Sequence, residues 1–312
     1  MKILFVIALS VSVILLAGGY YVFMTACHRR KEQQWEDPSA LENTQWAPLA
    51  DKINEHLCYL ADHNARDIYT SSADGLRLRA RWLPAENAIG TIMLFHGYRS
   101  SAMTDFSGGA ELSQAMGQNL LLVDQRAHGK SQGSTIAFGI RERFDCLQWC
   151  NYVVERFGEN TQILLYGISM GAATVLMASG LSLPRQVKGI VADCPYASAK
   201  EIICKVGNDL HLPAKLAYPF VALGARLFGG FPLEETDAIR AVEQAKTPIL
   251  IFHGEADSFV PEEMSRSVWE ANPTLVRRYT FPEAAHGISY LADPGRYRSI
   301  LESFAAEVLE KA

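Results

Sequence analysis

The stretch Leu164-Leu165-Tyr166-Gly167-Ile168-Ser169-Met170-Gly171-Ala172-Ala173 decides how this chain folds. Its first residues form an apolar run typical of a buried strand, and its last residues are small and suited to the start of a helix. Between them, Ser169 stands at the centre of a Gly-x-Ser-x-Gly turn. Glycine is needed on both sides because a side chain there would collide with the neighbouring strand and helix. The pattern predicts a nucleophile elbow, which holds the serine hydroxyl at the carboxyl edge of a sheet, beside a helix N-terminus.

The rest of the chain supplies the partners that such a serine needs. A serine hydroxyl becomes a good nucleophile when a histidine accepts its proton and a carboxylate orients that histidine. After an elbow of this kind, the acid and then the histidine are expected further along the chain. Asp257 follows a predicted strand that begins at Pro248, and His286 follows one that begins at Arg277. Ser169, Asp257 and His286 are therefore the predicted catalytic residues.

Two other acidic residues compete for the orienting role. Asp193 ends the predicted strand after the elbow helix, and this strand end could also reach the histidine. Asp257 is favoured because a mobile loop suits an orienting carboxylate. Glu255, two residues before it, is expected to be solvated.

The negative charge that forms on a substrate carbonyl oxygen requires two N–H donors. The amide of Met170, directly after the nucleophile, is one predicted donor. The amide of Tyr98 is the other, in the loop His96-Gly97-Tyr98 after an earlier predicted strand. The side chain of His96 is expected to pack beneath that loop.

Five motifs occur in order between residues 68 and 310. They are His96-Gly97-Tyr98, then Val123-Asp124-Gln125-Arg126-Ala127-His128-Gly129-Lys130-Ser131, then the elbow, then His253-Gly254-Glu255-Ala256-Asp257, then His286-Gly287. Together they resemble the alpha/beta-hydrolase superfamily, in the esterase/lipase-like branch that includes serine aminopeptidase S33-type sequences. The second motif is similar to the superfamily's Asp-x-Arg-x-His-Gly-x-Ser loop, so Asp124, Arg126 and His128 are expected to brace the edge of the sheet.

The resemblance and the alternation of strand and helix predict an α/β protein with the alpha/beta-hydrolase fold. It should have an eight-stranded, mostly parallel sheet, helices on both faces and a small helical cap. Strands are expected near residues 68–70, 76–82, 91–96, 119–124, 162–167, 188–193, 248–253 and 276–281. The connection between the sixth and seventh strands is too long for a simple crossover. Residues 198–246 are therefore predicted to form the cap within a hydrolase domain spanning 66–312, and its apolar underside suits acyl chains.

The N-terminus has a different character. No residue from Ile3 to Ala26 carries a charge, a stretch longer than the roughly 20 residues that span a bilayer as a helix. Residues 1–27 are therefore predicted to be a single uncleaved transmembrane anchor, and residues 28–65 a polar linker or docking segment. An alternative is cleavage before Cys27, since Met24-Thr25-Ala26-Cys27 loosely resembles a bacterial lipoprotein processing box. Arg29, Arg30 and Lys31 outnumber Lys2 and slightly favour a cytoplasmic catalytic domain.

Composition limits the remaining classes of function. The chain has 312 residues with a formal net charge of −5, and it shows no basic patch that would suggest a nucleic-acid partner. Its six cysteines lack paired metal-ligand spacing, so no metal or other cofactor is expected.

The sequence thus predicts a membrane-anchored serine hydrolase that cleaves a carboxylic ester or thioester through an acyl-enzyme. Its expected substrate is a small acyl ester or a lipid-like molecule. A serine peptidase or aminopeptidase of the same fold is one alternative, and a non-catalytic binding module with this fold is another.

Overall fold

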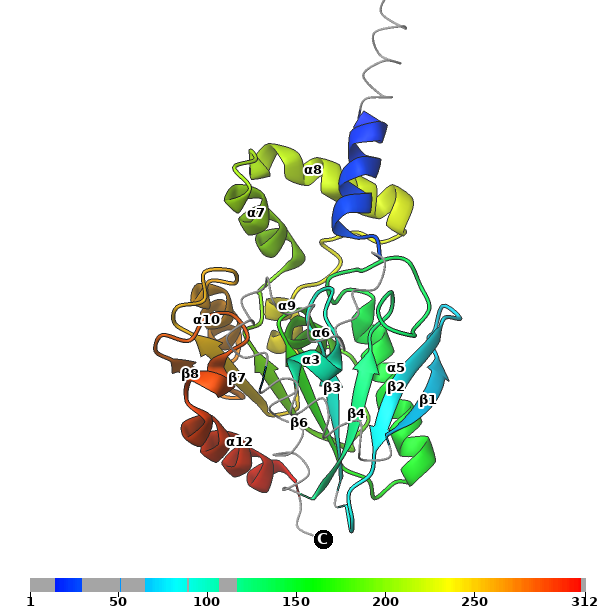
Figure 1. Cartoon of the computed structure of the whole chain (residues 1–312), viewed down its shortest axis with the longest axis vertical. Helices are drawn as coiled ribbons and strands as arrows, with labels where there is room; N and C mark the ends of the chain where they lie inside the picture. Colours follow the sequence, from blue (N-terminus) through cyan, green and yellow to red (C-terminus); the bar gives the residue numbers. More distant parts are fainter. Residues whose placement is uncertain (1–14, 30–50, 52–64, 89, 107–116, 310–312) are drawn as a thin grey trace, which may run out of the picture.

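The computed structural model of the chain describes residues 15–29, 51, 65–88, 90–106 and 117–309. Its centre is an eight-stranded sheet (Figure 1). The strands are β1 (Arg66–Ser71), β2 (Arg77–Leu83), β3 (Gly90–Phe95), β4 (Gln118–Asp124), β5 (Ile163–Ile168), β6 (Val187–Asp193), β7 (Ile249–Gly254) and β8 (Val276–Phe281). The eight predicted strands are therefore confirmed.

The strands lie in the order β1-β2-β4-β3-β5-β6-β7-β8. Strand β2 runs antiparallel to both of its neighbours, β1 and β4. Every pair from β4 through β8 is parallel, so the carboxyl ends of these strands meet at one edge of the sheet. The predicted mostly parallel sheet is confirmed, and its carboxyl edge is where the loops after β3, β5, β7 and β8 come together.

Helices cover both faces of this sheet (Figure 1). The helices are α3 (Ala102–Asp105), α5 (Glu142–Phe157), α6 (Met170–Ala178), α7 (Ala199–Asp209), α8 (Ala214–Gly224), the π-helical turn η3 (Ala225–Gly229), α9 (Ala238–Glu243), α10 (Glu262–Ala271), α11 (Ser289–Ala292) and α12 (Pro294–Val308). The apolar residues of α5, α6, α9 and α10 belong to one core cluster, and those of α3 and α12 to the other. The two clusters occupy opposite faces because successive strand side chains point to opposite sides.

Strand β3 shows this alternation. Met93 and Phe95 belong to the cluster with α5 and α6, whereas Ile92 and Leu94 belong to the cluster with α12. All four are almost completely buried. A strand covered on both faces has no polar side, which explains the continuous apolar runs in the sequence.

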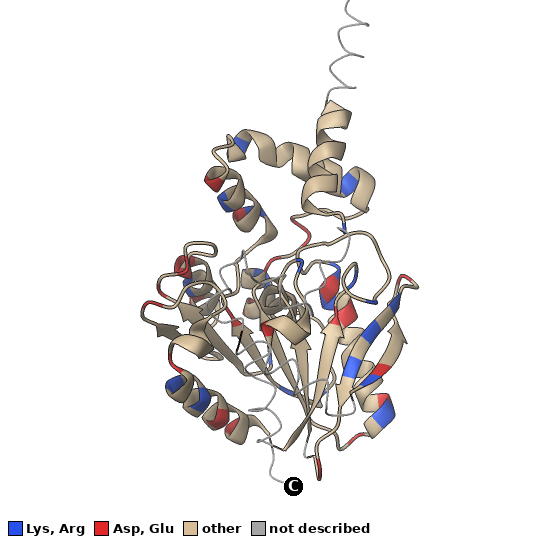
Figure 2. Ribbon diagram, in the orientation of Figure 1, with Lys and Arg blue, Asp and Glu red and all other residues tan. Residues whose placement is uncertain are grey.

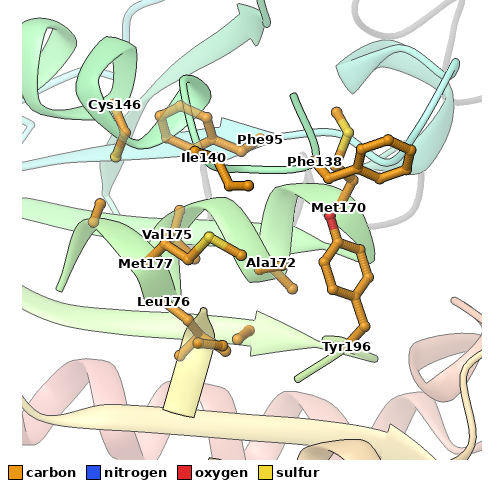
Figure 3. Packing of buried hydrophobic residues seen from close by; sticks show 14 of the residues in the cluster. Phe95, Phe138, Ile140, Cys146, Met170, Ala172, Val175, Leu176, Met177 and Tyr196 are labelled. Carbon is orange, nitrogen blue, oxygen red and sulfur yellow. The ribbon is translucent and has the colours of Figure 1, made fainter. Parts of the chain in front are cut away.

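The helix that follows the elbow is buried on all sides, because each of its nine residues is inaccessible to solvent. Figure 3 shows Ala172, Val175, Leu176 and Met177 of α6 packed among side chains from α5 and from the strands. Its small residues let it lie close to the sheet.

The region predicted as a cap contains two kinds of structure. Helices α7 and α8 stand beyond the carboxyl edge of the sheet (Figure 1). By contrast, α9 packs on the body that the sheet and its covering helices form, where a Cβ at Gly180 would lie 3.0 Å from the Cα of Ala241. The role of residues 198–246 as a cap remains a prediction.

Residues 15–26 form a helix that packs beside α8 (Figure 1). Within the described part of the chain, no helix combines the length and apolar character needed to cross a membrane. Residues 1–14 of the predicted anchor and most of the predicted linker 28–65 lie outside the described residues.

Candidate active site

The predicted elbow is present between the end of β5 and the start of α6. Ser169 has φ 55° and ψ −114°, a conformation that residues other than glycine rarely adopt. A Cβ at Gly167 would overlap the backbone of Gly171, and a Cβ at Gly171 would overlap the carbonyl of Phe95. Both glycines are therefore required by close backbone approach, as the sequence predicted.

The three predicted catalytic residues meet above this turn. His286, in the loop after β8, places its Nε2 2.9 Å from the Ser169 Oγ. Its Nδ1 lies 2.7 Å from the Oδ2 of Asp257, in the loop after β7. Because a carboxylate can only accept, Nδ1 carries the proton and Nε2 is free to accept one from the serine hydroxyl. The arrangement suits proton transfer from Ser169 to His286.

The carboxylate of Asp257 is held by further donors. Its Oδ1 accepts from the amides of Phe259 at 3.0 Å and Val260 at 2.8 Å. Burial of this group raises its pKa, but the bonds from His253, His286 and the Val260 amide outweigh that effect and lower the pKa below its ordinary value. Asp257 is therefore charged at neutral pH and fixed in position, as an orienting group must be.

The competing acids lie elsewhere. The carboxylate of Asp193 accepts from the hydroxyl of Tyr297 at 2.9 Å and from that of Ser289 at 3.1 Å. Its complete burial raises its pKa despite these two bonds. Glu255 is exposed and accepts from the hydroxyl of Thr280 at 2.6 Å. Neither carboxylate is hydrogen-bonded to the imidazole.

The loop after β3 lies beside the nucleophile. A Cβ at Gly97 would lie 3.4 Å from the Cβ of Ser169, so the backbone of this loop passes directly next to the elbow. The amide of Met170 opens α6 and has no carbonyl within the helix to bond. The roles of Met170 and Tyr98 as oxyanion donors remain predictions, supported by this proximity.

Asp105, at the end of α3, is a residue that the sequence reasoning missed. Its Oδ2 accepts from the Gly97 amide at 2.6 Å, and its Oδ1 from the Ser100 hydroxyl at 2.5 Å. Burial raises the pKa of this carboxyl, although both bonds oppose the effect. Asp105 thus fixes the loop beside Ser169. The only signal in the sequence was an acid in the first turn of a short helix after the Gly97 turn.

The structural role predicted for His96 is confirmed. Its Nε2 accepts from the Gln125 amide at 3.2 Å, and the Gln125 side chain donates to the His96 carbonyl at 2.6 Å. The hydroxyl of Thr174 on α6 also lies 3.1 Å from the Gln125 Oε1. These bonds tie the loops after β3 and β4 to the helix behind the nucleophile.

The bracing role predicted for the loop after β4 is also confirmed. Asp124 pairs with Arg79 of β2 at 3.0 Å, and Arg126 pairs with Asp145 of α5 at 2.6 Å. The ring of His128 accepts from a backbone amide of the loop after β3, and burial lowers its pKa well below the ordinary value. A histidine kept neutral in this way remains an acceptor.

Cys194 is a further group close to the candidate catalytic residues. Its Sγ lies 4.0 Å from the Nε2 of His286, and burial raises the pKa of the thiol well above the ordinary value. Ligand atoms of Cys194, Asp257 and His286 lie within 4.8 Å of one another, a spacing compatible with a metal ion. However, both imidazole nitrogens already face protein partners, so the arrangement favours proton transfer over metal binding.

Comparison with known proteins identifies one family model and several relatives to which this chain is similar. A family model described as "Serine aminopeptidase, S33" matches residues 86–229. The uncharacterized protein YqkD of Bacillus subtilis is 23% identical over 266 residues, which is 81% of this chain and 87% of YqkD. The uncharacterized protein YfhR of Escherichia coli K12 is 24% identical over 233 residues, covering 72% of this chain and 74% of YfhR.

Solved structures show the same fold. The Pyrococcus furiosus esterase Pf2001 superposes with a TM-score of 0.65 at 22% sequence identity. The alignment covers 81% of this chain and 94% of the esterase. At this identity the likeness establishes the architecture of the chain, while its chemistry rests on the residues described above.

Proposed function

We propose that this chain, which has the alpha/beta-hydrolase fold, is a membrane-anchored serine hydrolase acting on carboxylic esters or thioesters. The observation that carries the proposal is the continuous chain of hydrogen bonds from Ser169 through His286 to Asp257. A serine and a histidine that merely filled space would need neither this order nor a charged carboxylate behind them.

The reaction proceeds in two half-reactions. The Ser169 Oγ attacks the acyl carbonyl carbon while the Nε2 of His286 takes the hydroxyl proton. Asp257 orients the imidazole and stabilises the imidazolium that forms. His286 then gives the proton to the leaving alkoxide or thiolate, which departs and leaves an acyl ester on Ser169. Water, deprotonated by His286, attacks this ester and releases the carboxylic acid and the free serine.

Each tetrahedral intermediate places a negative charge on the former carbonyl oxygen. The amides of Met170 and Tyr98 bind that oxygen in the proposed mechanism. Removal of one such donor in other serine hydrolases costs on the order of 10²–10³ in kcat, so these amides are a large part of the proposed catalysis.

The acyl group of the proposed substrate is apolar. The exposed ring of Phe259 has its centroid 5.0 Å from that of the His286 ring, which places an apolar surface beside the reacting centre. The largely apolar helix α8 stands beyond the same edge of the sheet (Figure 1). These features support a lipid-like acyl ester over a charged substrate.

Anchoring in a membrane is also part of the proposal. The uncharged residues Ile3–Gly18, which precede the contact of the N-terminal helix with α8, support it, and the basic residues that follow Ala26 slightly favour a cytoplasmic catalytic domain. The side chain of Cys27 is completely buried. Lipid attachment at that thiol would require it to leave the core, which supports an uncleaved anchor over lipoprotein processing.

A fluorophosphonate probe tests the enzymatic proposal, because it labels only a serine activated by its partners. We expect labelling of the full-length chain, and its loss in Ser169→Ala and in His286→Ala. A folded wild-type chain that resists the probe would leave the non-catalytic binding module as the better explanation.

The serine peptidase alternative is favoured by one observation, the description of the matching family model. A panel of acyl esters, acyl thioesters and aminoacyl amides separates the two activities. The proposed function predicts turnover of the esters or thioesters at rates well above those of the amides, whose leaving amine needs fuller protonation. Faster turnover of aminoacyl amides would establish the peptidase.

A further inference from the structure

The exposed apolar side chains of this molecule gather at one end. Twelve large apolar side chains are exposed among the described residues. Nine of them lie on the N-terminal helix, on the α7–α8 connection with α8, or on η3, namely Leu15, Leu16, Tyr20, Tyr21, Leu210, Leu212, Leu216, Leu227 and Phe228. These elements stand together beyond the carboxyl edge of the sheet (Figure 1). We call residues 15–26 and 210–229 the apolar crown.

The crown is one packed unit. A Cβ at Gly19 would lie 3.4 Å from the carbonyl oxygen of Phe220, and a Cβ at Gly224 would overlap the carbonyl of Gly19. The ring of Tyr20 meets that of Phe228 edge to face at 5.1 Å, and Phe23 is buried beneath them. The backbones therefore touch through glycines, and the exposed apolar side chains project from a fixed surface.

The charge on the crown has one sign. Residues 210–233 contain no Asp or Glu, while Lys215 and Arg226 are exposed there. The N-terminal helix carries no charged residue, and the ribbon in Figure 2 has almost no acidic positions in the crown. Apolar side chains beside basic ones are typical of a helix that lies in the interfacial layer of a membrane with anionic lipids.

The sequence indicates what covers this surface. Residues Ile3–Gly18 are uncharged and continue directly into the crossing of the N-terminal helix with α8. Figure 1 shows α8 running across that helix. A helix that enters a bilayer would therefore bring α8 flat against the bilayer surface.

We infer that the apolar crown docks on the bilayer that the N-terminal stretch enters, with α8 lying in the headgroup layer. The substrate would then reach Ser169 from the lipid phase. The docking rests on the membrane anchoring proposed above, and the delivery of substrate to Ser169 rests also on the proposed catalysis.

Depth-dependent quenching tests the docking. The full-length chain carries Leu216→Cys, labelled with bimane, in a Cys58→Ser and Cys204→Ser background, since the other cysteines are buried. It is reconstituted in vesicles of phosphatidylcholine and phosphatidylglycerol, with or without brominated acyl chains. The matched control carries the label at Ser303→Cys, which is exposed on α12, outside the crown.

We expect brominated lipid to remove most of the bimane fluorescence at position 216 and almost none at position 303. Equal quenching at both positions, in chains that float with the vesicles, would overturn the docking. The crown would then be covered by a second copy or by another segment of the chain. Chains that fail to float would overturn both the anchoring and this inference. Loss of fluorophosphonate labelling with quenching retained would overturn the proposed catalysis and the delivery of substrate, and it would leave the docking standing.

A second variant separates docking from folding. Leu216→Glu combined with Leu227→Glu places charges on exposed positions, where folding tolerates them. We expect reduced turnover of an ester embedded in vesicles and unchanged turnover of a short soluble ester. An unchanged rate on the embedded ester would contradict delivery of the substrate from the lipid phase.

Discussion

At the scale of single residues, two buried carboxylates stand at neighbouring strand ends and have different hydrogen-bond partners. Asp257 accepts from the imidazole of His286, and Asp193 accepts from two hydroxyls. The side-chain amide of an Asp257→Asn variant could hold the imidazole in the wrong tautomer. We expect kcat to fall by about 10⁴-fold. Asp193→Asn should leave kcat within a few-fold of wild type and lower the free energy of unfolding by about 1–3 kcal/mol.

Ester hydrolysis and thermal unfolding of both variants check this prediction. A larger loss of kcat in Asp193→Asn than in Asp257→Asn would transfer the orienting role to Asp193. If both variants lose the same stability, kcat alone does not separate the two roles. Fluorophosphonate labelling of the folded fraction then does, because only Asp257→Asn should react slowly.

We propose that Asp105 is a positioning residue, and its effect should appear in kcat. Asp105→Ala removes the acceptor of the Gly97 amide and frees the loop that carries the proposed Tyr98 donor. We expect kcat to fall by up to about 10²-fold, the lower range for a lost oxyanion donor, with little change in KM. Ser101→Ala, which removes the N-cap of α3, is the matched control and should affect stability alone. A wild-type kcat in Asp105→Ala would show that the loop is held by other contacts.

The residues that the sequence predicted and those that it missed differ in a physical way. Ser169, Asp257 and His286 could be found because each follows a predicted strand in a fixed order along the chain. Asp105 could not, because its importance comes from a bond to the Gly97 backbone across a loop. The partners of Asp193 on α11 and α12 were equally invisible, since they lie about 100 residues away.

At the scale of elements, the strands were predictable and their order was not. Apolar runs bounded by turn residues located the five central strands β3 to β7, because a strand buried on both faces leaves that signature. Strands β1, β2 and β8 contain charged and partly exposed residues and leave a weaker signature. The order β1-β2-β4-β3-β5-β6-β7-β8 depends on which strands pair across the sheet. Local sequence patterns carry no information about such pairing.

The turn between β1 and β2 provides a pH-dependent test of one such long-range contact. Asp74 in this turn accepts from Arg126 of the loop after β4, and that bond lowers the pKa of the carboxyl to about 2. In the unfolded chain the pKa of the same carboxyl is about 4. Between these values the unfolded state binds more protons, so this contribution to stability is present above about pH 4 and is lost as the pH falls towards 2.

Urea unfolding between pH 5 and pH 2 should therefore show a smaller loss of stability in Asp74→Asn than in the wild type. The difference should not exceed about 1 kcal/mol, because the side chain of Asp74 is 57% exposed and exposed ion pairs contribute little. Glu86→Gln, an exposed carboxyl on the loop after β2, serves as control and should follow the wild type. Parallel curves for wild type and Asp74→Asn would show that the ion pair contributes nothing in solution.

At the scale of the whole molecule, the N-terminal helix packs on the loops at the carboxyl edge of the sheet. The carbonyl of Ala26 accepts from the hydroxyl of Tyr98 at 2.7 Å, and that of Thr25 accepts from the guanidinium of Arg99 at the same distance. Hydropathy predicted that residues 3–26 enter a membrane, but it could not indicate contact with the loop beside Ser169. The proposed anchor and the proposed oxyanion loop are therefore structurally linked.

This link gives a prediction for Gly224→Leu. A side chain at position 224 would collide with the carbonyl of Gly19 and would lie against Phe23, so the N-terminal helix has to move away from α8. Overpacking of this kind costs typically about 1–3 kcal/mol. We expect faster hydrogen exchange of amides in residues 15–29, unchanged exchange in the central strands, and a lower kcat because Tyr98 loses its acceptor. Lys215→Leu introduces the same side chain at an exposed position of α8 and should change none of these. If the amides of residues 15–29 exchange at the same rate in both variants, the helix is held by its own apolar contacts. The glycine crossing then does not determine its position.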